Sequence, residues 1–218
     1  MIATHTDGAS RPTAGALRLI EAGSVNPTRV DVHDYAASLF KHCPYLEASM
    51  ALGMTGWTVY EVAAGAHRDE VAAELFHAGV QAAEWVRQLM GRRHGVLVCE
   101  NIVILGDAVE ADHSELMAWP HWALKHLYGP VGVMFGKFAR NVRECDQLGR
   151  SIPPAPFSFL PVRASVRPRD PQFLRDTPDL ARSLAAGNDD GRDVFEHIPC
   201  DWKAVRAWAA SLPVPLKR

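Results

Sequence analysis

The stretch GVLVCENIVILG, residues 95–106, decides the fold, because it is one of the two longest apolar runs and has the length of a strand. Its apolar residues follow one another instead of alternating with polar ones. This pattern is typical of a central strand that is covered on both faces. Glu100 and Asn101 interrupt the run, and we expect a break in the strand at that point.

The segments on either side of this run predict a sheet with helices packed against it. His67 to Met90 carries one apolar stripe at helical spacing and is followed by Gly91, so it predicts a long helix. Further strands are expected at 56–63, 131–138 and 157–166, where Pro161 is typical of an edge or bulged strand. Shorter helices are expected at 14–22, 31–42 and 120–128, from residue 178, and at 200–212.

Strands and helices alternate in this order without a strict βαβ repeat. The pattern therefore predicts an α+β protein, with a single mixed or antiparallel sheet of about four strands and helices packed mainly on one face. Residues 1–12 are small, polar and proline-containing, and we expect a disordered tail there. Residues 13–218 are expected to form a single α+β domain.

Composition excludes several classes of function. The chain has 218 residues and a formal net charge of −2, so it lacks the basic excess typical of nucleic-acid binding. No 18 consecutive residues are apolar and no signal peptide is recognisable, so we expect a cytoplasmic protein without a membrane partner. The four cysteines are far apart and form no CxxC pair, which favours free thiols. A small-molecule substrate is the expected partner, and association of identical chains is left open.

Three clusters of residues suggest chemistry. The first is His42-Cys43-Pro44, where a helix is expected to end and the thiol to face a pocket. A thiolate there would suit a haem ligand or a nucleophile, and the alternative is a cysteine that only packs in the core. Standard nucleotide-binding, zinc-hydrolase and serine-hydrolase motifs are not found in the sequence.

The second and third clusters lie later in the chain. His121 is expected on a helix that also carries Trp119 and Trp122, where an imidazole would suit a haem ligand or an acid–base group. Arg163 and Arg167 have the same parity on an extended segment, so their guanidinium groups would point the same way and suit a carboxylate, a phosphate or a haem propionate. Their alternatives are an ordinary helix surface and a solvated strand.

These motifs resemble an uncharacterised family of mostly actinobacterial proteins that is found among natural-product genes. The likeness covers residues 31–185. It includes a Cys-Pro-aromatic motif at 43–45, a strand similar to GLMxGxF at 132–138, and a segment similar to SPxPLLxIR at 151–163. The family has no agreed activity, so the likeness implies a shared fold and a role in specialised metabolism.

A weaker likeness extends to the YqcI/YcgG family, which includes haem-dependent N-hydroxylases. The segment from Ser165 to Pro178 is similar to that family's late SRPxRRF…P stretch. The family's late histidine and its NPH motif have no counterpart here, so a haem in this chain would use another ligand.

The resemblance and the residues together lead to an ordered set of hypotheses. The first is a haem-dependent oxygenase, a monooxygenase-like oxidoreductase of natural-product metabolism. Its iron would be held by Cys43 or His121, and Arg163, Arg167 and Lys137 would be cofactor-binding residues. The second is a non-haem enzyme with Cys43 as nucleophile, a nearby histidine, and arginines that hold an anionic substrate. The third is a non-catalytic small-molecule binding protein.

Overall fold

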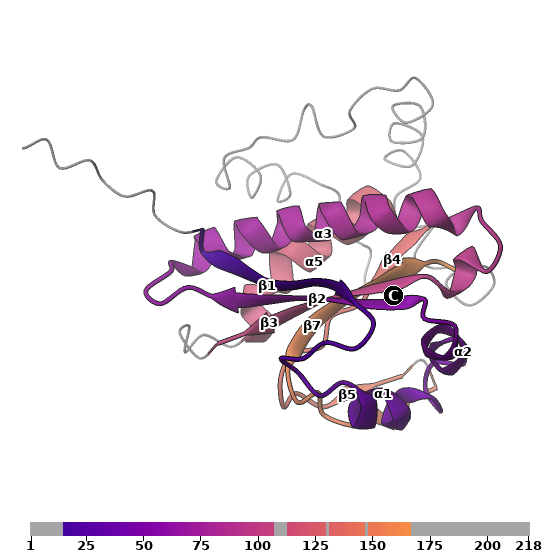
Figure 1. Cartoon of the computed structure of the whole chain (residues 1–218). Coiled ribbons are helices and arrows are strands. Elements are labelled where there is room, and N and C mark those ends of the chain that lie inside the picture. The colour runs from indigo at the N-terminus through magenta and orange to yellow at the C-terminus, as the bar shows by residue number, and fades with distance from the viewer. Residues whose placement is uncertain (1–14, 107–112, 130, 147, 167–218) are drawn as a thin grey trace, which may run out of the picture.

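A mixed five-stranded sheet forms the centre of the molecule. The computed structural model describes residues 15–106, 113–129, 131–146 and 148–166. The strand order across the sheet is β1 (Leu17–Ser24), β2 (Thr55–Val62), β3 (Cys99–Leu105), β7 (Ser158–Ala164) and β4 (Val133–Phe135). Strands β2 and β3 are parallel and every other neighbouring pair is antiparallel (Figure 1). The α+β prediction is confirmed.

The sheet has one strand more than the four we expected, because strand β1 forms where we predicted a helix at 14–22. It pairs with β2 at the edge of the sheet, and Arg18 forms an ion pair with Glu61 across the two strands. A carboxylate from the long helix also fixes its start, because Glu74 accepts the backbone N–H groups of Ala16 and Leu17 at 2.8 and 2.6 Å. The helical prediction was wrong because backbone partners on β2 override local propensity.

Strand β3 is central, as its apolar run predicted, but it is not broken at Glu100. A 3₁₀ turn, η1 (Gly95–Leu97), leads into a continuous strand. The Glu100 side chain is accommodated because Thr58 Oγ1 donates a 2.6 Å hydrogen bond to Oε1 and because Gly56 leaves room for it. A Cβ atom at Gly56 would lie 2.2 Å from Glu100 Oε2. Two residues of the adjacent strand β2 thus allow β3 to continue through Glu100.

Three helices cover one face of the sheet (Figure 1): α3 (Arg68–Met90), α4 (His113–Leu116) and α5 (Ala118–Tyr128). Helix α3 matches the predicted range, and its N-cap His67 accepts a hydrogen bond from the backbone of Asp69. Gly79 lets α5 approach closely, because a Cβ atom there would lie 2.3 Å from Leu124 Cδ1. The main core lies between these helices and the sheet residues Ile102, Ile104, Leu160 and Val162.

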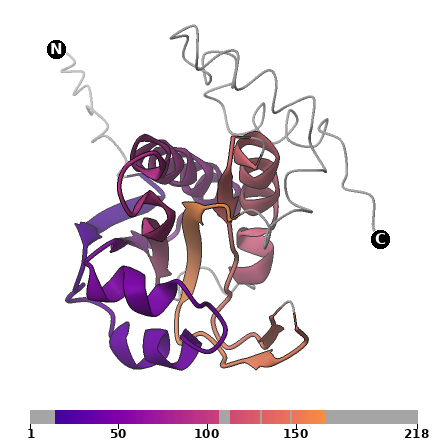
Figure 2. The same cartoon turned by 90° about the vertical axis from the view of Figure 1, so that its right-hand side faces the viewer.

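Shorter elements cover the opposite face. They are α1 (His33–Leu39), α2 (Leu46–Ala51) and the hairpin of β5 (Glu144–Cys145) and β6 (Ser151–Ile152), as Figures 1 and 2 show. A second core packs Tyr35 of α1 edge-on against Phe157 and Phe159, with ring centroids 6.1 and 6.0 Å apart. The expectation of helices mainly on one face therefore holds for the longer helices.

Strand β7 lies inside the sheet, between β3 and β4, and not at the edge that Pro161 suggested. The Pro161 carbonyl accepts the backbone N–H of Gly136, just beyond the end of β4. Because N–H and C=O of one residue face the same neighbour in an antiparallel ladder, the missing donor of proline falls where β4 has ended. Gly136 also makes room for the ring, since a Cβ atom there would lie 2.7 Å from Pro161 Cγ.

Several expectations fall outside the described residues. They concern the tail at 1–12, the helices from 178 and at 200–212, and Arg167. Within the ranges that the structure does describe, no helix is both long enough and apolar enough to cross a membrane.

Glu100→Gln should stabilise the protein in a pH-dependent way. Burial raises the pKa of the Glu100 carboxyl to about 7, above its unfolded value of 4.5. The protonated carboxyl therefore favours the folded state fully below pH 4.5, and this contribution is lost as the pH rises through 7. In chemical denaturation the variant should gain up to about 3 kcal/mol over the natural protein between pH 4.5 and pH 8.

The exposed Glu47→Gln provides the matched control and should show no such widening gap. A stability difference between Glu100→Gln and the natural protein that is the same at pH 4.5 and pH 8 would contradict the assignment.

Candidate functional site

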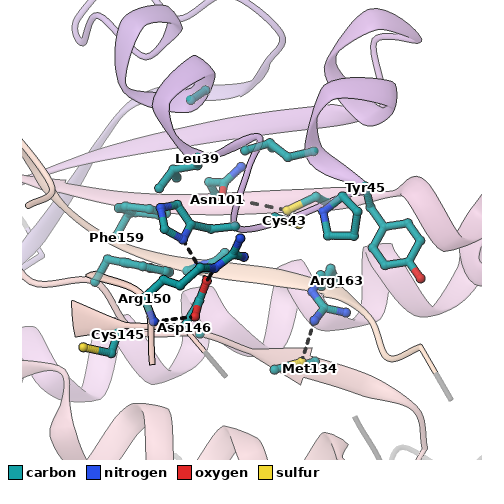
Figure 3. A pocket seen from close by; sticks show the side chains of 18 of the residues that line it. Leu39, Cys43, Tyr45, Asn101, Met134, Cys145, Asp146, Arg150, Phe159 and Arg163 are labelled. Atoms are coloured by element: carbon teal, nitrogen blue, oxygen red, sulfur yellow. Dashed lines mark hydrogen bonds and ion pairs between the residues drawn. The ribbon is translucent and has the colours of Figure 1, made fainter. Parts of the chain in front are cut away.

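A cavity of about 350 Å³ lies between the sheet and the shorter elements α1, α2 and the β5–β6 hairpin. Its size is near the lower end of the range for small-molecule sites, about 300–1,000 Å³. The walls are mainly apolar and include Leu39, Leu46, Trp57, Phe138, Phe159 and Pro161. A few polar side chains and thiols also face it, and Figure 3 shows them in place. Such a lining is typical of a site for a small organic molecule.

Cys43 lines this cavity, where we expected its thiol to be. It follows α1 in a tight turn, because the Leu39 carbonyl accepts the N–H groups of both His42 and Cys43 at 2.9 Å. Pro44 then ends the turn, and the Cys43 carbonyl accepts the N–H of Leu46 at the start of α2. The Cys-Pro sequence thus places a thiol between two helices, directed at the sheet.

Two further cysteines line the same cavity, Cys99 from β3 and Cys145 from β5, and all three are free. The Cys99 thiol donates a weak hydrogen bond to Asn101 Oδ1, with 3.8 Å between sulfur and oxygen. Burial, above all, raises the pKa of the Cys99 thiol to about 12, and nearby Cys43 raises it further when charged. Cys99 is therefore a protonated, weakly reactive thiol.

His42 and Asp146 form a pair at the cavity that the sequence did not predict. His42 Nδ1 and Asp146 Oδ2 are 2.9 Å apart, and their side chains are only 5% and 9% exposed. Asp146 also accepts the side chain of Arg150 at 2.7 Å and the backbone N–H groups of Leu148 and Arg150 at 2.9 Å. These donors, with His42 the largest contributor, hold the pKa of the Asp146 carboxyl well below its usual range, so it stays ionised.

The other ring nitrogen of His42, Nε2, is buried and has no hydrogen-bond partner among the residues that the structure describes, and His42 lines the cavity. Because Asp146 accepts the proton of Nδ1, Nε2 of the neutral ring is an acceptor. A carboxylate that fixes an imidazole in this way is found in general bases of hydrolases and in histidines that bind metal ions. In the neutral ring this nitrogen is the atom that can accept a hydrogen bond or bind a ligand atom.

Arg163 brings a positive charge to the cavity from β7, as the sequence suggested. Its guanidinium donates to the Ala164 carbonyl and to the Met134 sulfur, both at 2.9 Å. In Figure 3, Arg163 lies below Tyr45 and beside Met134, away from the Asp146–Arg150 pair. Its charge is close enough to Cys99 to oppose the rise in that thiol's pKa.

His121 and Lys137 lie on the other side of the sheet from Cys43 and are not part of the cavity lining. His121 Nε2 donates to the Phe135 carbonyl at 3.2 Å, and burial, with help from the charge of Lys125, lowers the pKa of the ring to about 3. Lys137 Nζ donates to Ser114 Oγ of α4 at 3.1 Å. The residues predicted as one haem site therefore divide between two faces.

Neither metal-binding groups nor known proteins narrow the choice of function for this cavity. Among residues 15–166, apart from the gaps named above, no group of three or more His, Cys, Asp or Glu side chains could hold a metal ion. No protein-family model, curated protein or solved structure matches the chain. The site must therefore be interpreted from its own geometry.

We expect alkylation to distinguish the thiols of Cys43 and Cys99. Iodoacetamide at pH 8 should modify Cys43 faster than Cys99, because only the thiolate reacts and the Cys99 pKa is raised to about 12. Peptide mass spectrometry over time gives the rate at each cysteine, and exposed Cys145 serves as the internal reference. Faster labelling of Cys99 than of Cys43 would show that the thiol environments are assigned the wrong way round.

Proposed function

We propose that the protein is an enzyme that acts on a small anionic organic substrate, with Cys43 as nucleophile and His42 as the general base. The observation that carries this proposal is the His42–Asp146 pair: His42 lines the same cavity as Cys43, and its buried Nε2 has no hydrogen-bond partner among the described residues. Buried polar atoms normally have partners, so an unpartnered one at a cavity favours a functional role.

The proposed reaction begins with transfer of the Cys43 thiol proton to Nε2 of His42. The thiolate sulfur then attacks an electrophilic carbon of the substrate, a C–S bond forms, and the leaving group departs with the proton that His42 returns. In the second half, His42 takes a proton from water, the resulting hydroxide attacks the same carbon, and the C–S bond breaks. The thiol is regenerated when His42 returns the proton to sulfur, so no external oxidant or reductant is needed.

Asp146 supports this reaction in two ways. Its hydrogen bond to Nδ1 selects the tautomer that leaves Nε2 free, and its negative charge stabilises the imidazolium that forms. The Asp146 carboxylate is itself fixed by Arg150, whose Nη2 also donates to the Lys41 carbonyl at 2.8 Å. The hairpin is thereby attached to the turn that carries His42 and Cys43.

His42→Asn and Asp146→Asn should each slow the alkylation of Cys43 at pH 7 by about tenfold or more, because fewer thiolates form without the base. At pH above 9.5 the rates should converge with that of the natural protein, since hydroxide then removes the proton. Site-resolved mass spectrometry measures the rates. His33→Asn, an exposed change on helix α1, which precedes the turn that carries His42, is the matched control.

A merely structural role for His42 would alter the rate equally at both pH values. That outcome, or an unchanged rate in His42→Asn at pH 7, would overturn the proposal.

Haem binding is a second candidate, because a thiol, an imidazole and a guanidinium line one cavity. Cys43 or His42 would hold the iron and Arg163 a propionate, and the bound group would supply oxygen activation. His42, with its Asp146 partner, replaces His121 in this candidate, since His121 faces the other side of the sheet. The volume of about 350 Å³ suits a small metabolite better than a haem together with a substrate.

Hemin titration decides between the two candidates. If haem is the cofactor, the natural protein should develop a Soret band whose position changes in Cys43→Ala or His42→Ala, while His121→Ala should leave the spectrum unchanged. Absorption spectra of protein produced with ample haem precursor give the same information. Protein that is colourless and develops no Soret band on titration removes the haem candidate and leaves the nucleophilic one.

A further inference from the structure

The cavity has two polar ends that differ in charge. One end is formed by Arg163, a cation on β7. The other end is formed by His42 and Asp146, where the carboxylate stays ionised. The labelled side chains in Figure 3 show Arg163 next to Met134 and Asp146 next to Arg150, with the two pairs apart from each other. A ligand that reaches both ends is therefore oriented by charge.

The Arg163 end favours an anion. One guanidinium nitrogen donates to the sulfur of Met134 at 2.9 Å, and a thioether is a weak acceptor. A carboxylate oxygen in that position would form a charge-assisted hydrogen bond, which is roughly twice as strong as a neutral one. An anionic ligand that replaces the Met134 sulfur as acceptor therefore forms a stronger hydrogen bond with Arg163 than the sulfur does.

The His42 end disfavours an anion and favours a hydrogen-bond donor. The Asp146 carboxylate would repel a second negative charge, and the charge of Arg150 is already paired with it at 2.7 Å. In the neutral ring of His42, the buried Nε2 is an acceptor that has no partner in the described part of the chain, so it would receive a hydrogen bond from a hydroxyl or amino group. Such a donor on the ligand would satisfy this atom.

The space between the two ends is apolar and suits a flat ring. Phe138 and Phe159 stack with ring centroids 4.8 Å apart and an interplanar angle of 7°, and Trp57 packs next to Phe159 with centroids 6.0 Å apart. A sugar or other polyol would leave its hydroxyl groups without partners against these walls. The volume of about 350 Å³ is sufficient for a single-ring molecule.

We infer that the ligand of this cavity is a small aryl carboxylic acid that carries a hydroxyl or amino group, with its carboxylate on Arg163 and its donor group on Nε2 of His42. This inference names the substrate class of the proposed enzyme and so rests on the proposed function. The aromatic ring lies against Phe138 and Phe159. Both polar ends of the ligand are then matched by a side chain of opposite character.

Isothermal titration calorimetry of the full chain with matched probes tests the inference. Among 4-hydroxybenzoate, 4-hydroxyphenylacetate and 2-aminobenzoate, at least one should bind. Its carboxamide should bind about tenfold or more weakly, because the charge-assisted bond to Arg163 is lost. Removal of the hydroxyl or amino group should also weaken binding, and succinate, which lacks the ring, should not bind.

Variants show which side chain binds each end of the ligand. Arg163→Met should reduce affinity for the acid but not for the amide, whereas Arg92→Met, an exposed change outside the cavity, should affect neither. His42→Asn should reduce affinity for the hydroxylated acid more than for its deoxy analogue. Circular dichroism of each variant confirms that it is folded.

The failure of this inference can be distinguished from failure of the proposed function. Binding is measured in Cys43→Ser, so the result does not depend on nucleophilic chemistry. Equal affinity for acid and amide, an unchanged affinity in Arg163→Met, or no binding by any of the three acids would overturn the substrate class. If Cys43 alkylation at pH 7 still depends on His42, the proposed catalytic pair survives that result.

Discussion

The structure depends on the burial of strand β3 on both faces. A strand in the middle of a sheet has side chains that point alternately to the two sides, so two sets of elements are needed to cover it. Helices α3 and α5 cover Ile102 and Ile104, and the shorter elements cover the side of Asn101 and Val103. The long helices pack closely against the sheet. The short ones leave the cavity between themselves and the sheet, so the site follows from an unequal covering of one strand.

A second interaction, between Asp146 and His42, connects the cavity to the stability of its own wall. Of the strand residues in the β5–β6 hairpin only Ile152 is buried, and the Asp146 carboxylate joins the hairpin to the turn after α1 through His42 and through Arg150. The same hydrogen bond that fixes the hairpin also fixes the imidazole tautomer. Because one contact serves both purposes, a loss of the hairpin contact and a loss of the free Nε2 acceptor cannot be separated by truncating Asp146 alone.

The two faces of the sheet also differ in how they treat ionisable groups. On the helix-covered face, burial raises the pKa of Glu100 to about 7 and lowers that of His121 to about 3, so both groups tend toward their neutral forms. On the cavity face, hydrogen bonds from His42 and Arg150 lower the pKa of the Asp146 carboxyl, so this group stays ionised. Charged groups that are held at a cavity can bind and transform a ligand, whereas neutral ones on a packed face contribute to the core.

The sequence by itself determined the α+β class, the long helix at 68–90 and the central position of the strand at 99–105, because these depend on local periodicity and length. It also singled out Cys43 and Arg163, which both line the cavity. It misassigned β1 as a helix and β7 as an edge strand, since backbone partners far along the chain decide both. The pairing of His42 with Asp146, 104 residues apart, and the division of Cys43 and His121 between opposite faces were decided only by the tertiary structure, because a contact between distant segments leaves no periodic signal in the sequence.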